Sequence, residues 1–142
     1  MARRMTEAEY LRFLAEGTRT AKVSVTRADG RPHVAPVWFT LDGGDVIFTT
    51  WHTTVKARSL ARDSRVCLCV DDERAPFAYV IVEGTTTLSE DPEALLRWAT
   101  VIAGRYMGAE QAETFGRRNG VPGELLVRVT PTKIIAESGV AE

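Results

Sequence analysis

The sequence predicts a mainly β fold, in which a small antiparallel barrel carries helices on its outside. About six segments have the β-branched and aromatic composition of strands, and most are joined by tight turns that enforce antiparallel pairing. Several of these segments are apolar on both faces, which does not suit a flat sheet with one face in water. A closed or nearly closed barrel fits this pattern best.

Length and charge limit the possible functions. The 142 residues suffice for one domain, expected to span residues 1–142, and are too few for two ordinary domains. The 18 basic residues are matched by 19 acidic ones, so we expect no nucleic-acid or membrane-surface partner, and any basic site must be local. Because neither a membrane span nor a signal peptide is recognisable, we expect a cytoplasmic protein.

The first expected elements are a helix and a strand. Thr6 and Glu9 have the spacing of a capping box, and apolar residues then recur at helical intervals to about residue 17. The segment Ala21–Thr26 alternates apolar and polar residues, as a half-buried strand does.

Two turns define the next strands. Asp29-Gly30 is a strong hairpin signal. It leads into His33–Leu41, a strand that is apolar on both faces, so we expect other elements to cover both of its faces. A second turn at residues 42–44 leads into Val46–Thr50. These strands should follow one another in antiparallel fashion.

The second half of the chain repeats strands and helices. A helix is expected from Thr53 to about Ala61, followed by strands at residues 66–71 and 77–88, with a bulge or close backbone approach at Gly84. Asp91-Pro92 begins a helix that should end near Gly104. A more polar helix at residues 109–119 precedes a last strand, residues 124–137, in which Pro131 marks an edge or a bend.

The segment Ile47–Leu60 contains the strongest functional signal. It reads as a strand that leads directly into a helix, with Thr53 and Thr54 as candidate N-caps. Lys56 and Arg58 lie in the first turn of that helix, where the helix dipole disfavours cations. A bound anion such as a phosphate would explain them, and a capped surface helix with solvated cations is the alternative.

Metal binding is not expected. The two cysteines, Cys67 and Cys69, are separated by one residue on a predicted strand, and the only histidines are His33 and His52. Zinc ligands are more often separated by two to four residues, so two small buried cysteines are the better interpretation.

Several motifs, in their order, resemble the FMN-binding split-barrel superfamily, which includes pyridoxamine 5′-phosphate oxidase. The resemblance is strongest to its F420-dependent (deazaflavin) branch. It rests on the DG hairpin followed by RPHVAPVWF, on the run Thr49, Thr50, Lys56, Ser59 and Leu60, on ARDSRVCL, and on PFAYVIVEGTTTL with a helix after it. The resemblance implies a six-stranded antiparallel split β-barrel with flanking helices.

The resemblance also implies a set of cofactor-binding residues. Val37, Trp38 and Phe39 would contact the ring, Thr49 and Thr50 would line the ribityl-phosphate side, and Lys56 would contact the phosphate with help from Thr54 and Arg58. Such relatives are homodimers with the cofactor at the interface, so Tyr79, with Phe77 beside it, is a candidate contributor from the second subunit.

The activity that the resemblance implies is hydride transfer from reduced F420 to an electron-poor small molecule. An FMN flavoprotein of the pyridoxamine phosphate oxidase type and a non-catalytic F420-binding protein are the alternatives. Val55 stands where the oxidase type usually has arginine, which weakens the case for tight FMN binding. No catalytic residue can be named: His33, His52 and Tyr79 are candidate proton donors, and solvent is another. Arg31 could add a cation for the acidic tail of F420.

Overall fold

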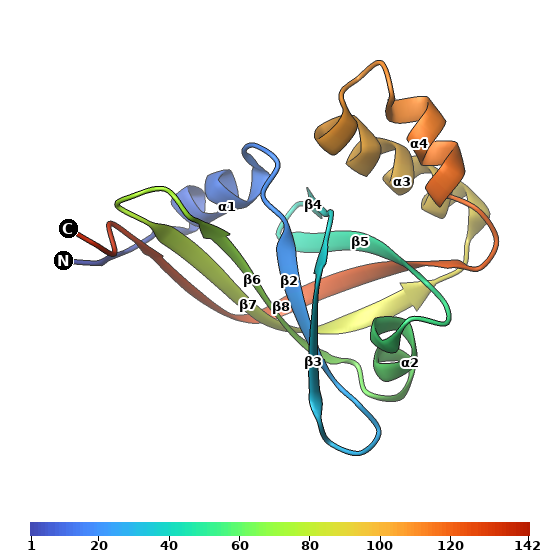
Figure 1. Cartoon of the computed structure of the whole chain (residues 1–142), viewed down its shortest axis with the longest axis horizontal. Coiled ribbons are helices and arrows are strands. Elements are labelled where there is room, and N and C mark those ends of the chain that lie inside the picture. The colour runs from blue at the N-terminus through green and yellow to red at the C-terminus, as the bar shows by residue number, and fades with distance from the viewer.

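The computed structural model describes residues 1–142 and contains eight strands and four helices (Figure 1). In chain order the elements are β1 (Arg3–Arg4), α1 (Glu7–Ala15), β2 (Ala21–Thr26), β3 (Pro32–Val37), β4 (Thr40–Asp42), β5 (Asp45–Trp51), α2 (Val55–Arg62), β6 (Arg65–Asp72), β7 (Ala78–Ser89), α3 (Pro92–Met107), α4 (Ala112–Asn119) and β8 (Glu124–Ser138). All strand pairs are antiparallel. The predicted combination of an antiparallel barrel-like sheet with flanking helices is confirmed.

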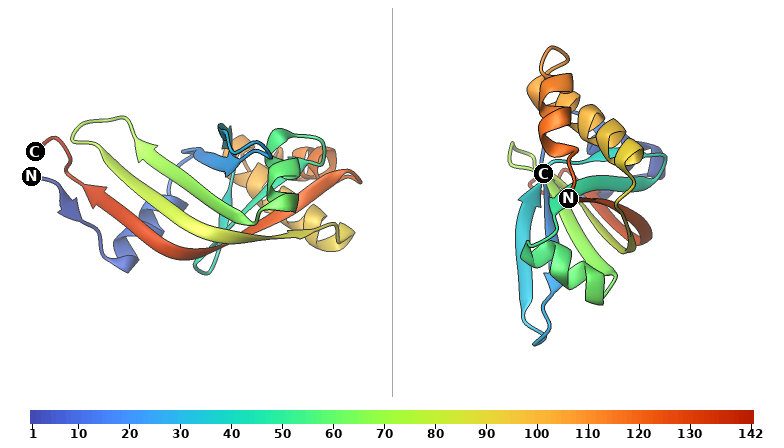
Figure 2. Two further views of the ribbon diagram at one scale, coloured as in Figure 1. Left: turned by 90° about the horizontal axis from the view of Figure 1, so that it is seen from below. Right: turned by 90° about the vertical axis from the view of Figure 1, so that its right-hand side faces the viewer.

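The sheet has the strand order β3-β2-β6-β7-β8-β5-β4, and β1 pairs with β8 outside this path. Strands β3 and β4 follow each other in the chain but end the path on opposite sides, joined only by Trp38 and Phe39. The sheet must therefore curl until its two ends come close, which gives an open, split barrel. Figure 2 shows this curvature along the long strands β7 and β8.

The expected strand His33–Leu41 is divided in two. Val37 is the last residue paired with β2, whereas Thr40 pairs with Ile47 of β5. The chain leaves one end of the sheet at β3 and joins the other end at β4. This division and the short strand β1, which was not expected, give eight strands rather than six. The prediction that both faces of His33–Leu41 are buried is wrong, because β3 is an end strand and Val34 is 62% exposed.

The core fills the inside of the curled sheet. Alternate residues of β2, β6 and β7 are buried, as the two-residue period of a strand requires. Phe39 and Phe48 are the largest fully buried side chains, and α1 closes one side with Phe13 and Leu14. Cys67 and Cys69 face the other side of β6 and are half-buried, so their predicted burial is only partly correct.

Local signals placed several elements correctly. The Thr6 hydroxyl accepts from the Glu9 N–H (3.2 Å), and the Glu9 carboxylate accepts from the Thr6 N–H (3.0 Å), so the predicted capping box is present. The predicted bulge lies between Glu83 and Gly84, where a Cβ on the glycine would be 2.5 Å from the Thr130 carbonyl oxygen. None of the four helices has both the length and the apolar character to cross a membrane.

The helices α3 and α4 form a pair at the β5 end of the molecule (Figure 1). Asp91 caps α3 as predicted, accepting from the Ala94 N–H (3.0 Å), but α3 continues to Met107, beyond the expected end at Gly104. Gly116 of α4 packs directly on the backbone of Thr100, where a Cβ would be 2.8 Å from the Thr100 Cα. The two helices are thereby held together as one unit.

Asp72 provides a test of stability against pH. Its carboxylate accepts from the Arg74 side chain (3.1 Å) and backbone N–H (2.9 Å) and pairs with Arg19 (3.2 Å). These contacts, the Arg74 side chain first, hold the pKa of Asp72 well below its usual value. A lowered pKa stabilises the fold above the unfolded-state value, and this contribution is lost as pH falls toward the folded-state value.

We therefore expect wild type to be more stable than Asp72→Asn at pH 7 and to lose that advantage progressively below about pH 4. Urea unfolding at several pH values measures the difference. Glu73→Gln, whose side chain makes no ion pair, is the control and should show a smaller difference at every pH. A pH-independent difference between wild type and Asp72→Asn would contradict the assignment.

Candidate functional site

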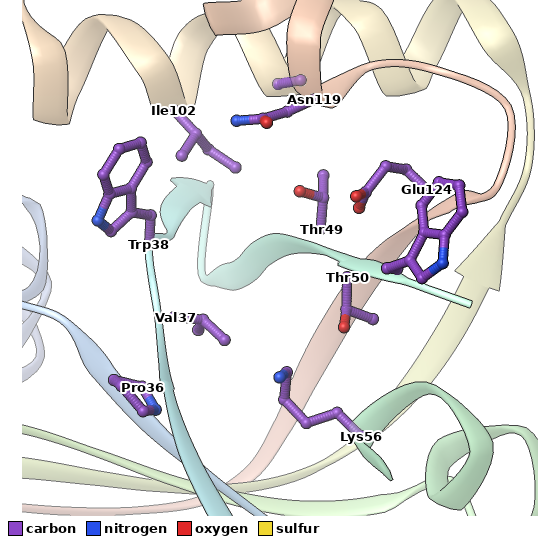
Figure 3. Close-up of a pocket in the computed structure, with 11 residues that line it drawn as sticks. Pro36, Val37, Trp38, Thr49, Thr50, Lys56, Ile102, Asn119 and Glu124 are labelled. Atoms are coloured by element: carbon purple, nitrogen blue, oxygen red, sulfur yellow. The ribbon is translucent and has the colours of Figure 1, made fainter. Parts of the chain in front are cut away.

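A pocket of about 270 Å³ lies where the barrel is split (Figure 3). Its walls come from the end of β3, from β5, and from the first turn of α2, with α3, α4 and the start of β8 opposite. The lining residues are Pro36, Val37, Trp38, Thr49, Thr50, Trp51, Lys56, Ala99, Ile102, Asn119 and Glu124. The pocket is therefore built from segments far apart in the sequence.

Hydrogen bonds fix the junction between β5 and α2. Thr54 caps α2, because its hydroxyl oxygen accepts from the Ala57 N–H (3.1 Å). The Thr54 hydroxyl proton goes to the Trp51 carbonyl (2.9 Å), so Thr50 is the donor in its 2.8 Å bond with Thr54. This chain of bonds holds the start of α2 against the end of β5.

The first turn of α2 offers unused donors to the pocket. Lys56 lies in this turn, and its ammonium makes no hydrogen bond or ion pair within the chain. The backbone N–H groups of Val55 and Lys56 also donate to no acceptor, and the turn contains no acidic residue. Free N–H groups and a free cation at a helix N-terminus form a site suited to an anion.

Glu124, the first residue of β8, places a carboxylate in the same pocket (Figure 3). Burial raises its pKa, an effect that His52 and Lys56 partly oppose. Its backbone is fixed by pairing with Trp51 and by Gly123, whose carbonyl accepts from the His52 N–H (2.8 Å) and Nδ1 (3.0 Å). Since a Cβ on Gly123 would lie 2.4 Å from the Trp51 ring, the indole packs directly on this backbone.

Trp38 supplies an aromatic wall. Its indole stacks on Tyr106 of α3 with ring centroids 5.0 Å apart and an interplanar angle of 2°. The Tyr106 hydroxyl donates to the Arg19 carbonyl (2.7 Å) and accepts from the Phe39 N–H (3.3 Å). Both bonds hold Tyr106, and hence Trp38, in a fixed orientation.

A comparison with protein families identifies the fold. The chain matches the family described as pyridoxamine 5′-phosphate oxidase over residues 6–137. The chain belongs to this family. No curated protein sequence matches the chain.

Solved structures agree with membership of the pyridoxamine 5′-phosphate oxidase family. The conserved hypothetical protein Rv2991 from Mycobacterium tuberculosis is 26% identical with a TM-score of 0.83, covering 95% of this chain and 86% of that one. An F420 reductase is 25% identical with a TM-score of 0.68, covering 86% of this chain and 93% of that one. An FAD-binding protein from Mesorhizobium loti, 14% identical with a TM-score of 0.70 and 96% of both chains covered, shares the fold.

The structure brings together most of the residues that the resemblance to this family selected. Val37, Trp38, Thr49, Thr50 and Lys56 all line the pocket. These residues are close in space because the end of β3 and the end of β5 flank the split in the barrel. Their predicted contacts with a cofactor stay a prediction.

Other selected residues lie outside the pocket. Thr54 lies behind its wall, bonded to Thr50. Phe39 is fully buried in the core, and its N–H and carbonyl are taken by Tyr106 and Arg105. Arg58 points to solvent on α2 without a partner in the pocket. Such a position does not favour phosphate contact by Arg58.

Tyr79 lies far from the pocket within one chain. It pairs with Glu137 near the end of β8, whereas the pocket contains Glu124 at its start. The Tyr79 hydroxyl donates to the Glu137 carboxylate (3.0 Å), which raises its pKa. Its predicted contribution from a second subunit, like that of the exposed Phe77, stays a prediction.

The candidate proton donors His33 and His52 also lie outside the pocket lining, as does Arg31, the cation expected to contact the acidic tail of F420. His33 Nδ1 accepts from the Arg27 guanidinium (3.2 Å), and Arg31 pairs with Asp29 (2.8 Å) in the same hairpin. His52 is exposed at the start of the turn between β5 and α2. No three His, Cys, Asp or Glu side chains are placed to share a metal ion.

Pocket residues from distant segments were missed by sequence reasoning. They are Pro36, Trp51, Ala99, Ile102, Asn119 and Glu124. Ala99 and Ile102 lie in the helix that Asp91-Pro92 was expected to begin, and nothing local in the sequence indicates that this helix faces β5. Trp51 and Pro36 adjoin residues that were selected, so extending each motif by one residue would have found them.

The cap of α2 provides a test of how the site is organised. Thr54→Val removes both the N-cap and the acceptor for Thr50, and we expect it to lower the free energy of unfolding by about 1–2 kcal/mol. Thr53→Val is the matched control, because the exposed Thr53 hydroxyl makes no hydrogen bond. Chemical denaturation measures both variants, and equal losses would contradict the assignment of Thr54 as the cap.

Proposed function

We propose that this protein is an F420-dependent oxidoreductase that transfers hydride from reduced F420 to an electron-poor small molecule. The observation that carries the proposal is the unpaired Lys56 ammonium beside two free N–H groups in a pocket that also has a stacked aromatic wall. The 25% identity to an F420 reductase supports the choice of cofactor within the family.

The donor set suits the negatively charged arm of such a cofactor. Lys56 and the first N–H groups of α2 would bind the phosphate, and Thr50 and Thr54 would keep that turn in place. Trp38, held by Tyr106, would offer a flat face to the ring. When bound, reduced F420 supplies the hydride, and the chain's own residues bind and orient it.

The proposal includes a homodimer with the cofactor at the interface. One chain supplies a cavity of about 270 Å³ that is open to solvent, and a second subunit would cover its open side. Tyr79 and the exposed Phe77 are the residues that we propose the second subunit adds. If this arrangement is correct, a heterodimer of one subunit altered at Lys56 and one subunit altered at Tyr79 would contain one complete site.

FMN is the alternative cofactor, favoured by membership of the pyridoxamine 5′-phosphate oxidase family. Both cofactors carry a phosphate that Lys56 can contact. The first residue of α2 is Val55, and no guanidinium lines the pocket to bind a phosphate through two parallel bonds. The smaller donor set suits the singly charged phosphodiester of F420 better than the doubly charged phosphate of FMN.

Fluorescence titration of the purified protein with F420 and FMN tests the proposal, followed by anaerobic oxidation of reduced F420 with quinone, enone and nitroaromatic acceptors. We expect a colourless protein that binds F420 more tightly than FMN and accelerates hydride transfer. A yellow protein with tightly bound FMN would establish the flavoprotein alternative. Tight F420 binding without hydride transfer to quinones, enones or nitroaromatics would establish a non-catalytic F420-binding protein.

A further inference from the structure

The anion site contains a carboxylate that phosphate binding does not require. Glu124 is the only acidic residue among those that line the pocket, which it shares with Lys56. Its carboxylate makes no hydrogen bond or ion pair within the chain. Figure 3 shows its oxygen atoms directed into the space near Thr49, opposite the wall formed by Trp38.

The position of Glu124 is fixed by the backbone around it. Pairing with Trp51, the packing of that indole on Gly123, and the two hydrogen bonds from His52 to the Gly123 carbonyl leave the start of β8 little freedom. The carboxylate therefore cannot withdraw from the pocket by a shift of the strand. Any anion held by Lys56 experiences the charge of Glu124 as well.

We propose that Glu124 makes this anion site selective for a phosphodiester over a phosphomonoester. The inference rests on the proposed function, because it takes the phosphate of the cofactor to be the anion at Lys56. A diester carries one negative charge, whereas a monoester is close to doubly charged above about pH 7. Repulsion by Glu124 and attraction by Lys56 both act about twice as strongly on the monoester, so Glu124 cancels the advantage that the ammonium alone would give to the second charge. The greater cost of removing the doubly charged monoester from water then leaves the diester preferred.

The charged groups around Glu124 are consistent with this role. His52 from the turn after β5 and Lys56 from α2 are the groups that lower its pKa, and Asn119 of α4 is neutral. Burial raises the pKa of Glu124 because the ionised form loses solvent. A doubly charged anion beside Glu124 would raise that pKa further. Its binding must therefore either overcome repulsion by the ionised carboxylate or be accompanied by protonation of Glu124.

Three ligands that share the same ring system but differ in charge separate the effect of ligand charge from that of ligand shape. The probes are the ribityl deazaflavin alcohol, its 5′-phosphate, and the methyl ester of that phosphate, titrated by fluorescence at pH 8. Because repulsion energy scales with charge, we expect Glu124→Gln to tighten monoester binding about tenfold, diester binding about threefold, and alcohol binding not at all. Glu124→Asp keeps the charge and should keep the preference for the diester.

Glu110→Gln is the matched control, since it removes one negative charge from an exposed loop residue outside the pocket. It should leave the ratio of monoester to diester affinity unchanged. Equal effects of Glu124→Gln on all three probes would overturn the inference and leave the proposed function in place. Failure of wild type to bind any phosphorylated probe or F420 would overturn the proposed function, and the inference with it.

Discussion

Replacing Arg105 by methionine is expected to lower the free energy of unfolding by about 3 kcal/mol, because the carbonyls of the buried Leu14 and Phe39 would lose a charged donor. Arg105 extends from α3 and donates to the carbonyls of Leu14 (2.8 Å), Gly17 (3.0 Å) and Phe39 (2.8 Å). Its guanidinium also lies over the Phe39 ring, 4.5 Å from the centroid. One side chain thus joins α3 to the end of α1 and to the link between β3 and β4.

The loss corresponds to a decrease in melting temperature of roughly 10 °C for a chain of this size. Calorimetry and urea unfolding measure it. Arg97→Met is the matched control, because Arg97 is exposed on the same helix and makes no hydrogen bond through its side chain. Arg105→Lys, which keeps the charge but not the planar group, should recover only part of the stability. Equal stability of Arg105→Met and Arg97→Met would show that these carbonyls are satisfied in another way.

The parts of the fold that sequence predicted correctly depend on short-range signals. The capping box at Thr6, the cap at Asp91 and the bulge at Gly84 each follow from a few neighbouring residues and from backbone geometry. The break between β3 and β4 could not be seen in this way. It arises because the two ends of a curled sheet are joined by one apolar segment, whose composition is the same whether it pairs on one side or on both.

The same distinction separates the predicted from the missed residues of the site. Thr49, Thr50 and Lys56 lie within one strand–turn–helix segment, where hydroxyl and charge patterns can be read directly. Asn119 and Glu124 enter the pocket only because α4 and the start of β8 are placed opposite that segment by tertiary packing. In the sequence, an acidic residue at the beginning of a strand has no feature that distinguishes it from a solvated one.

We expect Lys56→Ala to weaken F420 binding by roughly 30- to 100-fold, the loss of one charge-assisted hydrogen bond of about 2–3 kcal/mol. The ammonium has no partner within the chain, so its removal should leave the melting temperature nearly unchanged. Fluorescence titration gives the affinity, and calorimetry of the unliganded protein gives the stability. A variant that bound as tightly as wild type would exclude Lys56 from the anion site.

Arg58→Ala separates a specific contact from general attraction between charges. Both substitutions remove one positive charge from α2, but Lys56 lines the pocket and the exposed Arg58 does not. We therefore expect Arg58→Ala to change F420 affinity by less than about threefold, and by less still at high salt, where exposed charges are screened. Equal losses for the two variants would mean that the ligand is attracted by the charge of α2 as a whole. A large loss for Lys56→Ala alone would locate the phosphate at the first turn of this helix.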